Sequence, residues 1–377
     1  MKVLFLRSNP VDPDSRVEKE VESLLKNGIE AEIFCWDRSK NHKVIKEEKK
    51  IGNVKCPIYR AGFQSIYGAG FKKNFGPLVK FQNAIVQFIK INHYKYDVIH
   101  ACDFDTAFSA FRLARKYRIK FIYDIFDYYA DAFNVPKALK NIVINFDTNI
   151  INKSDAVIIC SEKRKKQLRE ARPKRLIVIH NSPKTINWRK NEENKSGFLS
   201  IAYVGILNDG RMIPEMLDIV SKNKKYKLLI GGFGKYESLV KKYALANENI
   251  IFYGKVPYEK TIRIESESDV LTALYDPAIP NHQYAAPNKF YEALMLGKPL
   301  IMCKNTGMSE VIEKNKFGIL IDFDRKGLEK GFKEVYSNID SFKKKQNEEK
   351  KLFDEKYSWN IMEKRLLKLY REIGKDL

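Results

Sequence analysis

Short apolar segments alternate with helical patterns along almost the whole of this 377-residue chain. In the first half the apolar segments fall at residues 3–6, 31–34, 98–101, 121–123, 156–160 and 176–179. Between most of them lie amphipathic stretches, such as residues 17–26 and 106–116. Strands that are apolar throughout, with helices between them, are typical of a parallel sheet covered on both faces. The first half therefore predicts a doubly wound α/β domain.

A second set of apolar segments follows a polar gap. These segments lie at residues 201–204, 227–230, 250–252, 270–274, 299–302 and 318–321. The gap, residues 187–197, carries no apolar period and has the composition of a linker. An amphipathic pattern over residues 357–370 predicts a final helix. The chain therefore predicts one domain over 1–190, a second over 191–355 and a terminal helix over 356–377.

Composition is that of a globular protein, with 44% hydrophobic and 31% charged residues. The segment from Met1 to Arg7 holds too few apolar residues for a signal peptide, and no apolar run of about 18 residues follows it. The cysteines show neither paired nor CxxC spacing, which favours free thiols over disulfides or a zinc site. They are Cys35, Cys56, Cys102, Cys160 and Cys303. We therefore expect a cytoplasmic protein.

The formal net charge of +22 bears on the choice of partner. A field of this sign attracts polyanions, among them nucleic acid, anionic lipid and phosphorylated metabolites. No recognition helix or aromatic RNA motif accompanies the charge, so a nucleic-acid partner is not expected. Two explanations stay open: a lysine-rich composition with solvated surfaces, or attraction to an anionic membrane.

One segment bears on the membrane explanation. Four apolar residues fall at helical spacing with lysines on another face: Leu78, Phe81, Ile85 and Phe88, against Lys80 and Lys90. A basic and aromatic stretch precedes them: Tyr67, Phe71, Lys72, Lys73 and Phe75. This combination suits a bilayer interface. The alternative is a helix that packs on its own sheet.

The stretch 286–301 reads as a loop, a short helix and a strand. Pro287 occupies a position typical of the first helical turn, and Gly297 one typical of a helix end. The backbone N–H groups of Asn288, Lys289 and Phe290 are then expected at the positive end of the helix, where they can hold a diphosphate. Glu292 follows one turn later, within reach of the sugar hydroxyls of the same nucleotide.

These residues resemble the (Ser/Ala)-Pro-x-Lys-x-x-Glu helix of retaining family-four nucleotide-sugar glycosyltransferases. The resemblance implies the GT-B fold: two Rossmann-like domains that face a central cleft, with a C-terminal helix that packs back on the first domain. It also implies transfer of a sugar from a nucleoside diphosphate to an acceptor hydroxyl. In the mechanism proposed for the family, the leaving phosphate takes the acceptor proton. Neither a metal nor another cofactor is then expected.

Three further pieces match the donor-binding half of this family. Gly205 ends a strand, and Arg211 follows it where the family places a basic residue that neutralises the diphosphate. Together with Lys289, Arg211 is the expected source of charge stabilisation in catalysis. Gly232 and Gly234 follow another strand and are expected to let the backbone approach the donor.

The third piece is the strand 249–256. In the family, backbone groups at the positions of Lys255 and Val256 meet the nucleobase. One departure from the family concerns the sugar: many members carry a glutamate eight residues before Glu292, and this chain has Tyr284 there. The identity of the sugar therefore stays open. His282 and Gln283 either take the place of that glutamate or belong to a solvent-facing loop.

The first half carries fewer family residues. The strand over 97–102 ends in Cys102 where relatives have a histidine, so the resemblance supplies no catalytic histidine. Asp103 follows at the end of the strand and is the predicted catalytic residue of this half. A DxD pattern, Asp103 with Asp105, matches the metal motif of an unrelated transferase fold, and we interpret it as coincidence. On the acceptor side, Asp124 and Asp127 lie at a strand end that resembles the family's, and Arg16, in the segment after the first strand, is a candidate to reach a phosphate.

Alternatives to an acceptor role stay open for these three residues: a capping or structural role for the two aspartates and a surface ion pair for Arg16. The sequence as a whole predicts a hexosyltransferase-like enzyme that uses a nucleotide-sugar donor and a glycan or lipid-linked acceptor. We expect it in surface polysaccharide or glycoconjugate synthesis, peripheral to the inner face of the membrane. The alternatives are a sugar-nucleotide epimerase or synthase of the same fold, or a non-catalytic basic binding subunit.

Overall fold

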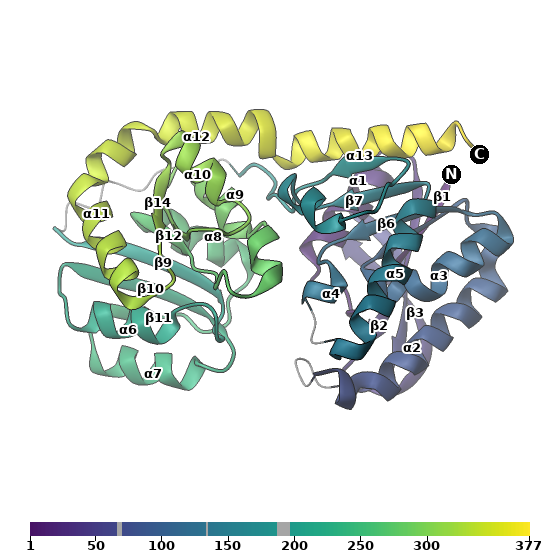
Figure 1. Ribbon diagram of the computed structural model, residues 1–377, viewed down its shortest axis with the longest axis horizontal. Coiled ribbons are helices and arrows are strands. Elements are labelled where there is room, and N and C mark those ends of the chain that lie inside the picture. The colour runs from purple at the N-terminus through teal and green to yellow at the C-terminus, as the bar shows by residue number, and fades with distance from the viewer. Residues whose placement is uncertain (66–69, 133–134, 187–196) are drawn as a thin grey trace. The chain divides into compact units, whose positions relative to one another are not determined.

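The computed structural model describes residues 1–65, 70–132, 135–186 and 197–377, and within these all side chains except those of 70–73 and 137 (Figure 1). The chain forms two compact units. The first comprises Met1–His180 with Glu363–Leu377, and the second comprises Asn181–Met362. The units therefore change at residues 180 and 362, and not at the 190 and 355 that the sequence predicts. The predicted linker falls almost entirely outside the described residues.

The first unit contains an eight-stranded sheet in the order β3-β4-β2-β1-β5-β6-β7-β8. Its strands are β1 Lys2–Arg7, β2 Glu30–Asp37, β3 His42–Ile51, β4 Val54–Gly62, β5 Val98–Cys102, β6 Lys120–Ile125, β7 Ala156–Ile159 and β8 Leu176–Val178. All neighbours pair in parallel except β3 and β4, which form an antiparallel hairpin at the edge. The sequence did not predict this hairpin. Elsewhere the predicted doubly wound arrangement is confirmed.

Side chains that alternate along each strand divide this unit into two packed faces. Ile99 and Ala101 of β5 belong to the core that lies under helices α2 (Gly70–Asn92), α3 (Phe104–Tyr117) and α5 (Lys137–Lys153). His100, between them, faces the opposite layer. That layer contains α1 (Ser15–Lys26) and the part of α13 (Trp359–Gly374) from Glu363 onward. A short helix, α4 (Tyr129–Ala132), precedes α5.

The apolar stripe on α2 lies on the inner face of that helix. Phe81, Ile85 and Phe88 are buried, and Leu78 packs against the same core. The stripe therefore covers the sheet of its own unit, which is the second of the two alternatives that the sequence left open. Tyr67 lies outside the described residues, as do the side chains of Phe71, Lys72 and Lys73. Within the described parts of the chain, no helix is both long and apolar enough to cross a membrane.

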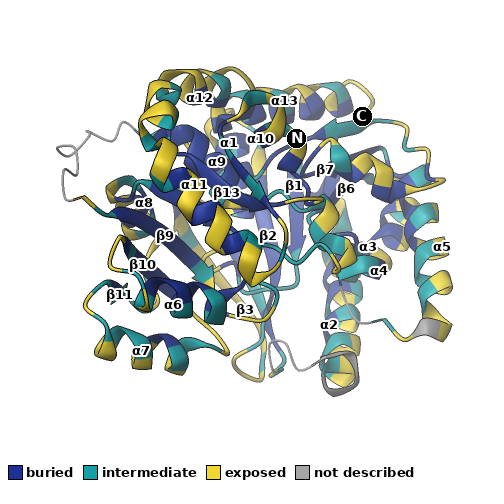
Figure 2. Ribbon diagram, turned by 60° about the vertical axis from the view of Figure 1, so that its left-hand side comes forward, coloured by how far each residue is buried: buried dark blue, intermediate teal, exposed yellow. Residues whose placement is uncertain are grey.

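The second unit contains a six-stranded parallel sheet in the order β11-β10-β9-β12-β13-β14. Its strands are β9 Leu199–Ile206, β10 Tyr226–Phe233, β11 Ile250–Phe252, β12 Val270–Ala273, β13 Leu300–Cys303 and β14 Gly318–Ile321. Its helices are α6 Ile213–Ser221, α7 Glu237–Ala246, α8 Tyr258–Glu267, α9 Asn288–Leu296, α10 Ser309–Asn315, α11 Arg325–Lys344 and α12 Gln346–Leu352. The strands are largely buried (Figure 2).

The strand order of this unit reverses between β9 and β12. From β9 the chain builds outward through β10 and β11, and it then returns to the other side of β9 with β12. In open α/β sheets, ligands bind outside the carboxyl ends of the strands at such a switch point. The loops after β9 and β12 are therefore where the topology places a site.

Candidate active site

Helix α9 begins at Asn288, and Pro287 is its N-cap residue, one position earlier than the sequence predicts. The N–H of Phe290 donates to the Pro287 carbonyl oxygen at 3.0 Å, so this amide is already used. The side chain of Phe290 is fully buried. The amide oxygen of Asn288 accepts a hydrogen bond from Asn181 at 3.1 Å. The predicted end of the helix at Gly297 is confirmed, with φ of 64° and its N–H bonded to the carbonyls of the last turn.

Lys289 lies at the carboxyl end of β9. Its ammonium donates to the carbonyl oxygen of Val204 and sits 5.2 Å from the centre of the Tyr203 ring. A Cβ atom on Gly205 would lie 3.2 Å from Nζ of Lys289. The first turn of α9 thus delivers a cation to the switch point between β9 and β12.

Arg211 lies in the loop before α6, and its guanidinium stacks 3.7 Å from the centre of the Tyr275 ring. Its Nη1 is 3.3 Å from Nε2 of His282. Because a guanidinium only donates, Nε2 must accept, and Nδ1 of His282 then carries the ring proton and donates to the Asp276 carbonyl at 2.9 Å. His282 is therefore a neutral side chain that orients Arg211. His282, which with Gln283 was considered as a replacement for the family's missing glutamate, thus has a role in orienting Arg211.

Tyr203 connects the two cations. Burial raises the pKa of its phenol above the usual range, the nearby Tyr275 adds to the shift, and the charge of Arg211 opposes it. Lys289 contacts the same ring. The chain thus gathers Lys289 and Arg211, 78 positions apart in the sequence, around a pair of tyrosines at the switch point. Two cations beside a helix start can bind a diphosphate.

Glu292 is 2% exposed and lies beside a second buried carboxyl group that the sequence analysis missed, that of Glu265 on α8, which is 1% exposed. The two carboxyl groups are close enough to interact, and a hydrogen bond between them requires that one of them carries a proton. Burial, with the charge of Glu292 added, raises the pKa of Glu265 well above its usual range. Among the described residues, no protein donor reaches either oxygen of Glu265. Glu265 is therefore the neutral partner, and Glu292 the anion.

Tyr258, at the start of α8, was also missed by the sequence analysis. The residue as a whole is 43% exposed, but burial of the phenol, followed by the nearby charges of Glu292 and Glu265, raises its pKa. Residues 258, 262 and 265 share one helical face, and Ile262 is fully buried. The sequence did contain one signal for this site: Glu265 is a glutamate on a helical face that is otherwise expected to be buried.

Gly232 and Gly234 allow a close approach within the protein itself. At Gly232 φ is 137°, and an added Cβ would lie 1.8 Å from the carbonyl oxygen of Gly205. At Gly234 φ is 138°, and a Cβ would lie 2.5 Å from the side-chain oxygen of Asn208. Both glycines therefore allow the ends of β9 and β10 to meet, because any larger residue would overlap the neighbouring loop.

The two residues after β11 differ in exposure. Lys255 is exposed, and its ammonium lies 5.2 Å from the centre of the Phe233 ring, which is itself 46% exposed. Val256 packs against a small apolar cluster that includes Val204. The side chain of Val256 is therefore structural, and any role with a nucleobase falls to its backbone.

In the first unit, Arg16 and Asp124 contact each other inside the core. Nη2 of Arg16 is 2.6 Å from one Asp124 oxygen, and Nε is 3.2 Å from the other. Arg16 is 3% exposed and Asp124 is not exposed at all. The predicted acceptor contacts of these two residues are therefore not available, because Asp124 precedes the end of β6 and points toward α1, where Arg16 meets it.

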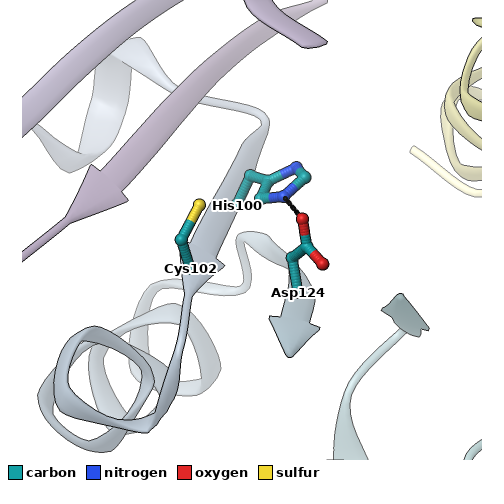
Figure 3. A group of neighbouring side chains, drawn as sticks. All are labelled: His100, Cys102 and Asp124. Carbon is teal, nitrogen blue, oxygen red and sulfur yellow. Dashed lines mark hydrogen bonds and ion pairs between the residues drawn. The ribbon is translucent and has the colours of Figure 1, made fainter. Parts of the chain in front are cut away.

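Asp124 also belongs to a buried cluster with His100 and Cys102, whose ligand-type atoms all lie within 4.8 Å of one another (Figure 3). Nε2 of His100 is 3.4 Å from Asp124, and Nδ1 is 2.7 Å from the hydroxyl of Tyr370 on α13. Burial lowers the pKa of His100 and raises that of the Cys102 thiol.

Arg16 already supplies positive charge to Asp124, so a cation bound here would have to displace the guanidinium and deprotonate Cys102. A carboxyl group with a raised pKa, Glu20, completes the cluster: burial and the charge of Asp124 favour its neutral form. Ion pairs and hydrogen bonds link these side chains to one another, although Nη1 of Arg16 and both oxygens of Glu20 have no hydrogen-bond partner among the described residues. We interpret the cluster as the anchor that holds α13 on the first sheet.

Asp103 holds the loop that follows β6. One of its oxygens accepts from Arg7 at 2.5 Å, and the other accepts the backbone N–H groups of Phe126 at 2.9 Å and Asp127 at 3.1 Å. Burial raises the pKa of Asp103 to about 7 despite the neighbouring Arg7. Asp127, in the anchored loop, has a side chain that is 49% exposed, with Arg164 3.3 Å away. Of the predicted acceptor-side residues, Asp127 is the one at the surface.

Two family matches divide the chain almost where the structure does. Residues 16–182 match Glycosyltransferase Family 4, and residues 184–352 match Glycosyl transferases group 1. The chain belongs to glycosyltransferase family four. It is 24% identical over 314 residues to an uncharacterized glycosyltransferase of Methanocaldococcus jannaschii, covering 79% of this chain and 73% of that one.

Solved structures resemble this glycosyltransferase over its full length. The sucrose-phosphate synthase of Thermosynechococcus elongatus superposes with a TM-score of 0.76 at 17% identity, with all of both chains covered. Anabaena HepE in complex with UDP-glucose gives 0.67 at 13% identity, with 100% of this chain and 99% of that one covered. An E. coli trehalose-6-phosphate protein bound with UDP-2-fluoro glucose gives 0.72 at 8%, with 99% of each covered. These likenesses show the GT-B fold and confirm the predicted fold class.

Proposed function

We propose that this glycosyltransferase moves a sugar from a nucleoside diphosphate to an acceptor hydroxyl with retention of the anomeric configuration. The observation that carries the proposal is the convergence of Lys289 and Arg211 at the switch point, with Glu292 one turn further into the same helix. Two of the solved relatives carry UDP-glucose or UDP-2-fluoro glucose. Their ligands support a nucleotide-sugar donor here.

In this proposal the diphosphate binds at the start of α9. The Lys289 ammonium exchanges its contact with the Val204 carbonyl for a phosphate oxygen, and Arg211 approaches from the loop before α6. Both cations then stabilise the charge that develops as the sugar departs. Glu292 accepts hydrogen bonds from the ribose hydroxyls, and it stays an anion because Glu265 holds the shared proton. Backbone groups at Asn288, Lys255 and Val256 complete the donor contacts.

The transfer requires no protein nucleophile, since the departing phosphate takes the acceptor proton. The proposal includes no metal: Arg211 and Lys289 supply the positive charge that a divalent cation supplies in other transferases. On the acceptor side, the proposal gives Asp127 the role of accepting a hydrogen bond from the acceptor hydroxyl; its side chain is 49% exposed, and Asp103 holds its loop. The acceptor is a glycan or lipid-linked sugar of a surface polysaccharide or glycoconjugate, made at the cytoplasmic face of the membrane.

The test is a donor screen followed by product analysis. UDP-, GDP- and ADP-sugars are added in turn, and the melting temperature identifies which one binds. Turnover of that donor is then measured with and without glycan acceptors, and proton NMR of the product gives the anomeric configuration. Donor consumption that needs no acceptor would identify an epimerase or synthase. An inverted product would refute retention.

A further inference from the structure

The outer side of the helical layer α2–α3–α5 exposes apolar side chains on all three helices. On α5, Leu139, Ile142 and Phe146 are 41%, 51% and 39% exposed and share one helical face. Phe108 of α3, 36% exposed, packs edge to face on Phe146 with ring centres 5.5 Å apart. We call these residues, together with Phe75 and Val79 of α2 (51% and 41% exposed), the α2–α3–α5 face.

This face is distinct from the stripe that the sequence analysis considered for membrane contact. The stripe on α2 is buried against the sheet, whereas Phe75 and Val79 point away from it. Helices α2 and α3 pack on each other, as do α3 and α5 (Figure 1). Figure 2 shows exposed positions along α2 and α5. The apolar residues therefore belong to one continuous layer.

The charges around the face are of one sign. The sequences of the three helices contain only two carboxylates, Asp105 and Asp147, although the chain has 47 acidic residues. Neither is exposed, and Asp147 accepts a hydrogen bond from the buried Tyr123. Exposed basic residues lie on all three helices: Lys80, Lys90, Arg112, Arg115, Lys116 and Lys153.

Several apolar residues of the face lie toward one end of the helices and several basic residues toward the other, where Ile91 of α2 is also exposed. Helices that connect parallel strands run antiparallel to them, so α2, α3 and α5 all begin at the carboxyl edge of the sheet. Phe75, Phe108 and Leu139 lie near these beginnings, while Lys90, Lys116 and Lys153 lie near the ends. The end of the face that holds Phe75, Phe108 and Leu139 therefore adjoins the edge of the sheet that carries the Asp127 loop.

We infer that the α2–α3–α5 face docks on an anionic lipid bilayer. Exposed aromatic and branched aliphatic side chains enter the headgroup region, and the basic residues behind them meet anionic headgroups. A lipid surface fits better than a folded protein partner or a nucleic acid. A protein partner would have to supply specific hydrogen bonds to the exposed amide side chains that lie beside the apolar residues of α5. These are Asn141, Asn145 and Asn149. A nucleic acid would leave the aliphatic pair on α5 without a role.

Docking in this orientation brings the carboxyl edge of the first sheet, and with it Asp127, toward the membrane. A lipid-linked acceptor would then meet the enzyme at the bilayer surface. The choice of a lipid-linked acceptor rests on the proposed function, whereas the docking of the face does not.

The test is sedimentation of the full chain with vesicles of phosphatidylglycerol and phosphatidylcholine, or of phosphatidylcholine alone. The wild type should bind the anionic vesicles at low salt, bind them much less at high salt, and bind neutral vesicles weakly. The double variant Leu139→Glu with Ile142→Glu should lower the anionic partition coefficient at least about tenfold. Leu245→Glu is the matched control, because Leu245 is 91% exposed on α7 of the other unit. It should bind like the wild type.

Charge is tested in the same way by Arg115→Glu with Lys116→Glu, against Lys241→Glu with Lys242→Glu on α7 as the control. Melting temperatures report whether each variant is folded, and the temperature shift caused by nucleotide sugar reports donor binding separately. Wild-type protein that stays in the supernatant at low salt would overturn the inference. The inference is also overturned if the control variants lose as much vesicle binding as the test variants. It is overturned as well if the change of the basic pair reduces binding but the change of Leu139 and Ile142 does not. In either case, general attraction to polyanions explains the binding. If no nucleotide sugar shifts the melting temperature while vesicle binding is intact, the proposed function is refuted and the docking inference is not.

Discussion

Replacing Glu265 by glutamine should stabilise this glycosyltransferase increasingly as the pH rises. In the unfolded chain a glutamate ionises with a pKa near about 4.3. In the folded protein burial and the charge of Glu292 raise the pKa of Glu265 well above that value. Between the two pKa values folding takes up a proton, so the contribution of Glu265 to the free energy of unfolding is fully present at low pH. It falls by about 1.4 kcal/mol for each pH unit above the unfolded pKa.

Glutamine cannot ionise, and its side-chain N–H can still donate to Glu292. The free-energy difference between variant and wild type should therefore grow by about 1.4 kcal/mol per pH unit. For a unit of this size, 1 kcal/mol corresponds to about 2–4 °C in Tm. The Tm advantage of Glu265→Gln should thus grow by about 3–6 °C per pH unit between pH 5 and pH 7.

The assay is thermal unfolding of both proteins across this pH range, followed by circular dichroism. Glu267→Gln, an exposed change on the same helix, is the negative control. Glu349→Gln on α12 is the positive control, because burial raises the pKa of Glu349 to about 8. Its advantage should grow in the same way between pH 5 and pH 7, and it should level off once the measurement is extended past about pH 8. A pH-independent Tm difference for Glu265→Gln, or a growing disadvantage, would mean that Glu265 is ionised and that the shared proton is misassigned.

Three further predictions concern the donor site. Glu292→Gln should weaken nucleotide-sugar affinity by roughly 1–3 kcal/mol, the range for a hydrogen bond to a charged group, and unchanged affinity by calorimetry would remove Glu292 from the ribose. Arg211→Ala should lower kcat more than it weakens donor binding, and His282→Ala should show a smaller loss of the same kind. Equal losses in binding and in kcat would mark Arg211 as a ground-state ligand. Gly232→Ala should lower the yield of folded protein or the Tm, since its Cβ would overlap the Gly205 carbonyl oxygen. Wild-type stability would refute the close approach of the two loops.

The parallel sheets could be predicted because their signal is local. A strand buried on both faces is apolar throughout, and the segments at 98–101 and 201–204 show this directly. The end of α9 at Gly297 has an equally local signal, a residue that tolerates positive φ. The hairpin strand β3 was missed because it lacks this local apolar signal. It is rich in lysine and glutamate, and most of its residues are exposed, so it carries no apolar run.

The residues of the site divide in the same way. Lys289 and Arg211 follow from motifs near strand and helix ends, and the structure adds the tyrosines that gather them. The pairing of Glu265 with Glu292 joins residues 27 positions apart on different helices, which no local pattern records. For Asp124 the sequence indicates a nearby strand end but not which face of the sheet the side chain takes. That face is occupied by Arg16, so the residue belongs to the core.

The unit boundaries depend on contacts of longer range still. The hydrogen bond between His100 and Tyr370 joins residues 270 positions apart and ties α13 to the first unit. An amphipathic pattern predicts the helix, and the family resemblance, not the pattern, indicated that the first sheet receives it, as the structure shows from Glu363 onward.

The central claim is that Lys289 and Arg211 hold the diphosphate of a nucleotide sugar. Its most direct test is the Tm shift produced by UDP-, GDP- and ADP-sugars in the wild type, in Lys289→Met and in Arg211→Ala. Lys314→Met, an exposed change on α10, is the control. At least one nucleotide sugar should raise the Tm of the wild type and of the control, and the shift should be largely lost in Lys289→Met and reduced in Arg211→Ala. No shift with any nucleotide sugar, or a shift that survives unchanged in Lys289→Met, would contradict the claim.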